Sequence, residues 1–444
     1  MARGASADIT IVGLGPGETA QRTNAARLAL VSARVLFLRT RNHPGTDDLV
    51  SRAGVRIVAE MVPTLPNGGK DWIAGAALIC DEAHHGPVVL GVPGHPHFGE
   101  RLVTETLRAA AERRLSVRVL DGLSVLDLMA TALGIDPMVE DAQIVDAAQL
   151  VATVGDGPFS GGLAPFTPLR PLLLSRVYGR ATATGLARIL LRIFPPDQPV
   201  VVINAAGIPG EERVSHTTVG ALADEDPGDL VSLYIPRLGE LDAVRDPRTL
   251  QHIVARLRRP DGCPWDRKQD HTTLRDSIID EAYEVVDAID AGDDHNLAEE
   301  LGDLLLLVMM HAQIAEEAGT FRLEDVYEGI SRKIVRRHPH VFGDMSAEDA
   351  GEVIGLWNQV KAQEKADQPN KPEKAADGQP HAMPALVRAP KVLRKHPLPG
   401  NLGQSTAEDR SRALLQAVAE IVAAGDDPET VLRQALIDHV NSTS

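Results

Sequence analysis

A change in hydrophobic patterning near residue 238 constrains the fold of this chain more than any other feature of its sequence. From residue 9 to about residue 238, short β-branched runs alternate with longer stretches of helical periodicity. This alternation predicts an α/β fold with a largely parallel sheet. From residue 238 to about residue 365, apolar residues recur at helical spacing and no comparable strand run occurs. The sequence therefore predicts a multidomain protein in which an all-α part follows an α/β part.

Six strands of the α/β part stand out as apolar runs between loops rich in proline and glycine. They are ITIV from Ile9, VLFL from Val35, VVLGV from Val88, VRVL from Val117, VVVIN from Val200 and LVSLYIP from Leu230. With 444 residues, the chain is long enough for two or three domains of ordinary size.

Charge and cysteine content exclude several classes of protein. The chain carries 45 Lys and Arg against 62 Asp and Glu, and this net charge of −17 disfavours nonspecific nucleic-acid binding. Cys80 and Cys263 are too few for a disulfide framework and indicate a reducing compartment. The longest wholly apolar run, residues 304–310, is far shorter than a membrane span. We therefore expect a cytoplasmic protein that binds neither nucleic acid nor a membrane.

Two consecutive helices of the all-α part carry carboxylates beside their apolar faces. The first begins near Thr272, with Thr273 as its N-cap, and stops at Gly292. Its predicted buried stripe consists of Ile278, Ala282, Val285 and Ile289. The second helix begins near Asp294, and its predicted buried face carries His311 as a packing residue.

Four of these carboxylates are candidate metal ligands. Glu281 and Glu284 border the stripe of the first helix, Glu300 lies on the predicted buried face of the second, and Asp303 lies at its edge. Unpaired carboxylates that converge there would repel one another, and a divalent cation removes this cost. Oxygen-only ligands favour Mg²⁺, with Mn²⁺ as a substitute. The alternative for either pair alone is a solvated helix face.

Basic residues flank the acidic helices and are candidate nucleotide-binding residues. Trp265 and Lys268 precede the first helix, and Lys333, Arg336 and Arg337 follow the second. In an acidic chain, such residues near a metal site indicate a polyphosphate clamp. The alternative for the downstream group is an ordinary basic helix end. Trp265 is equally consistent with stacking on a base and with a place in the core.

These segments together resemble the MazG family of nucleoside triphosphate pyrophosphohydrolases. The resemblance rests on LRRPDGCPWDRKQ from Leu257, DEAYE from Asp280, ELGD from Glu300 and KIVRRHPHVFGD from Lys333. It implies an all-α, Mg²⁺-dependent homodimer that cleaves nucleoside triphosphates to the monophosphate and pyrophosphate. The family's two acidic motifs place its metal ligands at Glu281, Glu284, Glu300 and Asp303. Asp280 replaces the family's usual Glu and points away from the stripe, so we leave it out of the ligand set.

The C-terminal tail resembles the remnant of a second MazG copy. The E-x-x-D motif of this copy would fall on Asp409 and Arg412. Because Arg412 stands where the motif has an acidic metal ligand, we expect this copy to be inactive. We therefore divide the chain into a methylase-like domain (1–238), a MazG domain (239–368), a linker (369–385) and the remnant (386–444).

The methylase-like assignment rests on three glycine-containing loops that follow strands. Gly13, Gly15 and Gly17 follow the first strand, VPGHPHFGE from Val92 contains Gly94 and His95, and DGLS from Asp121 contains Ser124. Alone, the first loop is as consistent with a tight turn as with ligand binding. Together the loops resemble the tetrapyrrole methylase family, whose two α/β lobes hold S-adenosylmethionine in their cleft. His95 stands where that family has an acid.

Three functions follow from these resemblances. The first is Mg²⁺-dependent hydrolysis of nucleoside triphosphates by the helical domain, with Glu284 as a candidate base. The second is an S-adenosylmethionine-dependent methyltransferase with a regulatory helical domain. The third is a nonenzymatic sensor of nucleotides or of the cofactor.

Overall fold

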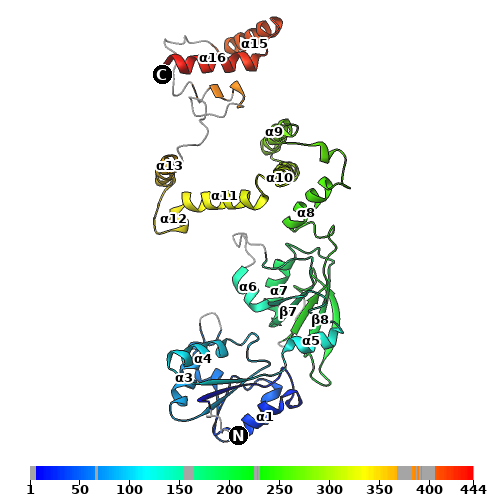
Figure 1. The fold of residues 1–444 in the computed structure, drawn as a ribbon, viewed down its shortest axis with the longest axis vertical. Coiled ribbons are helices and arrows are strands. Elements are labelled where there is room, and N and C mark those ends of the chain that lie inside the picture. The colour runs from blue at the N-terminus through cyan, green and yellow to red at the C-terminus, as the bar shows by residue number, and fades with distance from the viewer. Residues whose placement is uncertain are drawn as a thin grey trace. The chain divides into compact units, whose positions relative to one another are not determined.

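The computed structural model describes residues 7–65, 69–154, 164–224, 228, 231–367, 383–386, 388–389, 392 and 406–443. It divides into two compact units, Met1–Phe321 and Arg322–Ser444. The first contains both sheets with their helices and a further helical part over residues 247–317, and the second is helical (Figure 1). The predicted domain boundaries at residues 238, 368 and 385 remain predictions.

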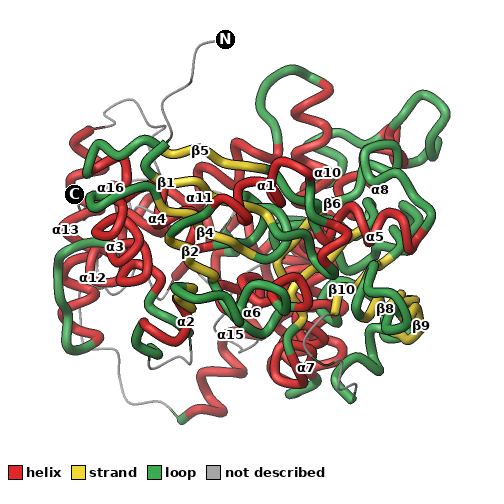
Figure 2. Tube along the Cα trace, turned by 90° about the horizontal axis from the view of Figure 1, so that it is seen from below, coloured by secondary structure: helices red, strands yellow, loops and turns green. Residues whose placement is uncertain are grey.

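The first lobe is a parallel five-stranded sheet of order β3-β2-β4-β1-β5. Its strands are β1 (Ile9–Gly13), β2 (Val35–Leu38), β3 (Val55–Ile57), β4 (Val88–Val92) and β5 (Val117–Leu120). Its helices are α1 (Asn24–Ser32), α2 (Val58–Met61), α3 (Trp72–Ala83) and α4 (Arg101–Glu112), with 3₁₀ turns at Thr19–Gln21 and Pro44–Thr46. Strands β5, β1, β4 and β2 lie side by side in this order (Figure 2).

Alternation along the strands gives this sheet two buried faces. Ile9 and Ile11 of β1 pack with Ile79 of α3 and Leu102 of α4, whereas Val12 packs with α1 on the opposite face. Because successive side chains point to opposite sides of a strand, helices on both faces require a strand that is apolar throughout.

The second lobe has a sheet of order β6-β7-β10-β8-β9. Its elements are α5 (Val125–Leu133), β6 (Gln143–Asp146), α6 (Ala147–Val154), β7 (Leu172–Val177), α7 (Gly179–Leu190), β8 (Pro199–Asn204), β9 (Arg213–Thr218) and β10 (Val231–Ile235). Helices α6 and α7 cover one face, and Met129 of α5 packs on the other against Leu173 and Ile203.

The largely parallel sheet that the sequence predicts is found in the first lobe. In the second lobe only β6 and β7 are parallel, and the other three pairings are antiparallel. The sequence also missed β3, β6, β7 and β9. Strand β3 has only three residues, and β9 is an exposed edge strand without an apolar run. All six predicted strands are confirmed.

Three helices complete the first unit, namely α8 (Pro247–Arg258), α9 (Arg275–Ala291) and α10 (Asp294–Glu317), with a 3₁₀ turn at Asp266–Lys268. Arg258 joins them: its guanidinium donates to the carbonyl of Asp266 at 2.5 Å and lies 2.8 Å from the carboxylate of Glu317. Only 6% of the Arg258 side chain is exposed, so its ion pair with Glu317 joins α8 to α10 through a buried guanidinium group.

The second unit contains α11 (Leu323–Arg337), α12 (Pro339–Phe342), α13 (Ala350–Asp367), α15 (Ala407–Ala423) and α16 (Pro428–Thr443). Apolar spacing predicts helices over roughly 408–424 and 428–440, and α15 and α16 confirm both. Asp409 takes part in the N-terminal capping box of α15, and Arg412 pairs with Glu408 on the same helix. Residues 369–382 of the predicted linker lie outside the described residues. No helix in the described part of the chain is long and apolar enough to cross a membrane.

Candidate functional site

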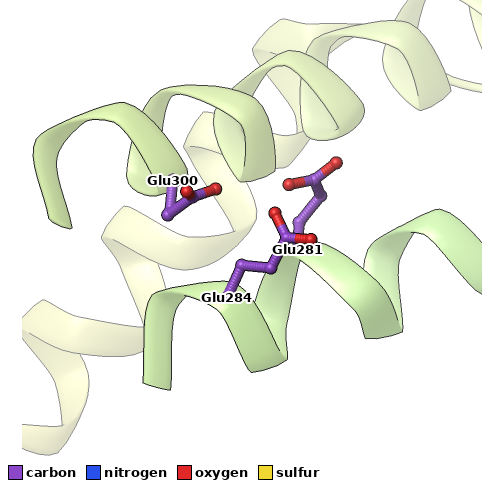
Figure 3. Close-up of side chains that lie close together, drawn as sticks. All are labelled: Glu281, Glu284 and Glu300. Carbon is purple, nitrogen blue, oxygen red and sulfur yellow. The ribbon is translucent and has the colours of Figure 1, made fainter. Parts of the chain in front are cut away.

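Three of the four predicted metal ligands converge between α9 and α10. One carboxylate oxygen from each of Glu281, Glu284 and Glu300 lies within 4.8 Å of the other two. Figure 3 shows the two α9 side chains pointing toward Glu300 of α10. Asp303 is outside this group, although its charge acts on both Glu281 and Glu300. Among the described residues, no Lys, Arg or His forms an ion pair with any of the three glutamates.

The helical hairpin sets this convergence. Gly292 ends α9 with a left-handed φ of 67°, a conformation that favours glycine, and the Asp293 carboxylate then caps α10. The tight connection brings α10 back along α9, so that the paired acids face each other across the hairpin. Thr273 is not the N-cap: its hydroxyl bonds with Asp270, and Leu274 holds the cap position.

Partial burial, followed by carboxylate crowding, raises the pKa values of Glu281 and Glu300. The pKa of Glu281 is raised further by the charges of Glu284, Asp303 and Asp280. For Glu300, a hydrogen bond with Glu284 adds to the effect of burial on the pKa. A divalent cation would neutralise these charges, and an all-carboxylate donor set suits Mg²⁺ or Mn²⁺.

The predicted buried stripe of α9 is not buried within this chain. Ile278 and Ile289 are 37% and 56% exposed, and Ala288 is the buried residue of the helix. The expectation failed because α9 packs mainly on α10 and leaves its other faces open. On α10 the apolar face is confirmed at Leu307 and Ile314, both 8% exposed.

His311 also lies on this face of α10, stacked on His271. The two rings are 5.1 Å apart and nearly parallel, and their Nδ1 atoms lie 2.8 Å apart. Burial, with the adjacent His271, lowers the pKa of His311. A packing role for His311 agrees with this contact.

The candidate nucleotide-binding residues divide between the two units. Trp265 and Lys268 lie in the first unit on the loop before α9, and Trp265 is 63% exposed, which removes the core alternative for it. Lys333, Arg336 and Arg337 lie in the second unit, in the last turns of α11. Lys333 is exposed.

Arg336 and Arg337 are both held by Glu364 of α13. Their guanidinium groups approach the Glu364 carboxylate to 2.5 and 2.6 Å, and Arg337 also lies 5.9 Å from the ring centroid of Trp357. These two arginines lower the pKa of Glu364 to about 2. The sequence reasoning did not find Glu364 or Trp357, because both follow α11 by a turn and a further helix.

In the first lobe, the three glycine-containing loops meet at the carboxyl ends of β1, β4 and β5. Gly15 and Gly94 exchange backbone hydrogen bonds of 3.2 and 2.8 Å. A Cβ on Gly13 would lie 2.6 Å from the backbone nitrogen of Gly122 and 2.7 Å from the Gly94 carbonyl oxygen. Glycine is therefore required at position 13 for the loops to pack.

These loops border a cavity of about 250 Å³ between the two lobes. Gly94 and His95 line it directly. Gly13, Gly15, Gly17 and Ser124 do not line it, and Ser124 instead caps α5 by accepting from two backbone N–H groups. His95 lies 3.5 Å from the carboxylate of Asp121, which supplies an acid beside the position where the family's own is missing.

The sequence reasoning missed the titratable residues that line this cavity, namely Arg39, His43, Glu100, Asp146 and Arg176. One signal was available, because Arg39 directly follows the predicted strand VLFL and ligands of such sheets bind at the carboxyl ends of strands. Arg176 could not be found this way, since its strand was itself missed.

Comparisons with known proteins agree with both parts of this architecture. The family described as "Tetrapyrrole (Corrin/Porphyrin) Methylases" matches residues 8–223, and the "MazG nucleotide pyrophosphohydrolase domain" matches residues 269–342. The uncharacterized protein YabN of Bacillus subtilis is 34% identical over 388 residues, which cover 87% of this chain and 76% of YabN. The chain is a MazG-family protein with an N-terminal tetrapyrrole methylase domain.

Other relatives match shorter parts of this MazG-family protein. The nucleoside triphosphate pyrophosphohydrolase of Escherichia coli K12 is 45% identical over 144 residues, 32% of this chain and 54% of that protein. The nucleoside triphosphate pyrophosphohydrolase/pyrophosphatase MazG of Thermotoga maritima is 50% identical over 116 residues, 26% of this chain and 44% of that protein. The uroporphyrin III C-methyltransferase structure from Thermus thermophilus has a TM-score of 0.38 and 19% identity, covering 51% of this chain and 91% of that one.

Proposed function

We propose that the helical domain hydrolyses nucleoside triphosphates to the monophosphate and pyrophosphate with Mg²⁺ as cofactor. The convergence of Glu281, Glu284 and Glu300 within 4.8 Å carries this proposal. The MazG nucleotide pyrophosphohydrolase domain supports it, since it matches residues 269–342, which contain these glutamates. Two relatives of the chain are also named as nucleoside triphosphate pyrophosphohydrolases.

Glu281, Glu300 and Asp303 would hold the cation, and Glu284 would complete the set. When bound, Mg²⁺ supplies positive charge that offsets the triphosphate and favours ionisation of water. Glu284 would act as the base that accepts a proton from the attacking water. Lys333, Arg336 and Arg337 bind phosphate oxygens, and exposed Trp265 stacks on the base.

Hydrolysis in ¹⁸O-labelled water tests the reaction and its position. The full chain with Mg²⁺ should release pyrophosphate from a panel of nucleoside triphosphates, and chelation with EDTA should stop it. Attack at the α-phosphorus places the label in the monophosphate. Label in pyrophosphate would show attack at the β-phosphorus, and release of inorganic phosphate alone would contradict the proposal.

A homodimer is the second element of this proposal. Exposed apolar side chains recur with helical spacing on both acidic helices, at Ile279, Tyr283 and Val286 and at Leu301, Leu305 and Val308, each 41–50% exposed. Two such stripes in one hairpin leave a continuous apolar surface open. A second copy of the chain would cover it through the same helices.

We further propose that the methylase domain binds S-adenosylmethionine at its glycine loops. The close packing of the loops around Gly13 and the adjacent cavity support this. Titration calorimetry of the full chain with S-adenosylhomocysteine should detect binding at about micromolar strength. Gly13→Val should abolish it, and an absence of heat from the folded wild-type chain would contradict the proposal.

A further inference from the structure

The segment that joins α8 to α9 carries two of the proposed nucleotide-binding residues. We call this segment, residues 259–274, the Trp265 loop. Trp265 is 63% exposed and Lys268 is exposed as well, so both are accessible to a nucleotide. The regular structure of the loop, all of which the structure describes, is the 3₁₀ turn Asp266–Lys268. A turn of three residues is too short to be stable by itself, so contacts with other elements must fix the loop.

Arg258, the last residue of α8, supplies two such contacts. Its Nη1 donates to the carbonyl of Asp266 at 2.5 Å and to the carbonyl of Gln269 at 3.1 Å. Its Nε and Nη2 each donate to the Glu317 carboxylate of α10 at 2.8 Å. Four of the five N–H groups of the guanidinium thus have acceptors, and 6% of the side chain is exposed. Arg258 is therefore placed to hold the loop and not to bind a nucleotide itself.

The two carbonyls that Arg258 holds bracket the candidate binding residues in the chain. Asp266 follows Trp265, and Gln269 follows Lys268. The Trp265 carbonyl accepts from the Lys268 N–H and from the Gln269 side-chain amide, each at 3.1 Å. Residues 265–269 are thus closed on themselves, and the guanidinium sets where they lie relative to α8 and α10.

The ion pair with Glu317 strengthens this attachment. The hydrogen bond from Arg258 lowers the pKa of Glu317, and burial opposes it. The ionised carboxylate binds one edge of the planar guanidinium and so orients Nη1 toward the two carbonyls. Arg256 on the same helix offers a contrast. It pairs with Asp261 of the same loop at 2.7 Å, but the two side chains are 49% and 59% exposed, so this pair contributes little.

We propose that Arg258 is a positioning residue for nucleotide binding, which holds the carbonyls of Asp266 and Gln269 so that Trp265 and Lys268 meet the substrate. The inference rests on the proposed function, because it requires that these two residues contact the nucleotide. It assigns to Arg258 an effect on nucleotide affinity that passes through the loop, and no part in the chemistry at the acidic helices.

Steady-state kinetics of the full chain test this with Arg258→Lys. Lysine keeps a charge opposite Glu317, but its single ammonium cannot serve both carbonyls and both carboxylate oxygens. KM for the nucleotide should rise about fivefold or more, with kcat within about twofold of the wild type. In a chain that already carries Trp265→Ala and Lys268→Ala, Arg258→Lys should raise KM no further, because the contacts through which it acts are gone. Arg256→Gln is the matched control and should leave KM unchanged.

Trp265 fluorescence measures nucleotide binding without turnover. The chain has three tryptophans, so Trp72→Phe and Trp357→Phe leave Trp265 as the only one. A panel of α,β-methylene nucleoside triphosphates, which cannot be cleaved at that bond, should include a member that quenches Trp265 by stacking. Arg258→Lys should raise the Kd of that member about fivefold or more.

Three results would overturn the inference: an equal Kd in the two folded proteins, a KM increase that persists without Trp265 and Lys268, or no quenching of Trp265 by any analogue. A chain that binds the analogues but releases no pyrophosphate would instead refute the proposed hydrolysis, and the Kd comparison would still decide the role of Arg258. Should Arg258→Lys not fold, Arg258→Gln combined with Glu317→Gln takes its place, because it leaves no buried charge unpaired.

Discussion

At the scale of single residues, the acidic cluster is the feature with the clearest energetic consequence. Glu281, Glu284 and Glu300 are brought together by the hairpin without a basic partner among the described residues. Like charges held this close destabilise the protein until a cation binds. The three glutamates therefore favour metal binding and lower the stability of the metal-free protein. A substitution that removes one charge should affect these two properties in opposite directions.

Removing one charge from this cluster should uncouple activity from stability. Glu281→Gln and Glu300→Gln should each lower turnover about a hundredfold or more, since each removes a proposed metal ligand. Their melting temperatures without Mg²⁺ should equal or exceed that of the wild type. Asp290→Asn, roughly opposite Glu281 on α9, is the control and should leave turnover unchanged. Wild-type turnover in either glutamate variant would refute the ligand assignment.

His43 predicts a dependence of stability on pH. Its Nδ1 accepts from the Gly45 N–H, so the ring is neutral and its Nε2–H donates to the carbonyl of Pro16 at 3.1 Å. Burial lowers its pKa from 6.5 to about 4. Because the unfolded chain binds the proton more readily, stability should fall between pH 6.5 and pH 4, by at most about 3 kcal/mol.

Urea unfolding of the first lobe measures this effect. Trp72 fluorescence reports on that lobe in a chain carrying Trp265→Phe and Trp357→Phe. His43→Asn keeps an acceptor for Gly45 but cannot titrate, so its stability should change less over the same pH range. Parallel pH profiles for the two proteins would show that His43 is not the titrating group.

At the scale of secondary-structure elements, a pair of ion pairs joins α11, which carries Arg336 and Arg337, to α13. Glu364 binds both Arg336 and Arg337, and Arg337 also lies beside Trp357. Without the carboxylate, two adjacent guanidinium groups would repel each other and move apart. The anchor therefore positions the cations that we propose to contact phosphate.

Glu364→Gln should raise KM for the nucleotide severalfold with a smaller effect on kcat, because it disorders a binding group and leaves the acidic cluster intact. The low pKa of Glu364 has a second consequence. Its contribution to stability is present above its ordinary pKa of 4.5 and is lost as the pH falls toward about 2, so the variant should lack this part of the acid transition. Glu352→Gln on the same helix is the control, and an equal KM for wild type and Glu364→Gln would contradict the positioning role.

At the scale of the whole molecule, association should depend on the apolar stripes of α9 and α10. Leu305→Glu places a charge on the proposed dimer surface, where Leu305 is 44% exposed, and should yield a monomer in light scattering. Leu28→Glu on α1 is the control, because Leu28 is 61% exposed and lies far from these helices in sequence. A dimer that survives Leu305→Glu would place the interface elsewhere.

The helical domain should also function when separated from the methylase domain. Helix α8 begins at Pro247 and packs on α10, so a fragment of residues 239–368 keeps every helix of the proposed active site. We expect this fragment to release pyrophosphate at a rate within about tenfold of the full chain. A folded, dimeric fragment without activity would show that the methylase domain contributes to the site.

The sequence by itself determined the two-part architecture, the acidic helices and the glycine loops, because each depends on short-range spacing along the chain. Periodicity places Glu281 and Glu284 on one helix and Glu300 on the next, on either side of the turn at Gly292, and the structure brings them together as expected. Only the tertiary structure decided which carboxylate each arginine pairs with. Arg176 pairs with Asp146, Arg39 with Glu100, and Arg337 with Glu364. These contacts join segments distant in sequence, and no local pattern records them.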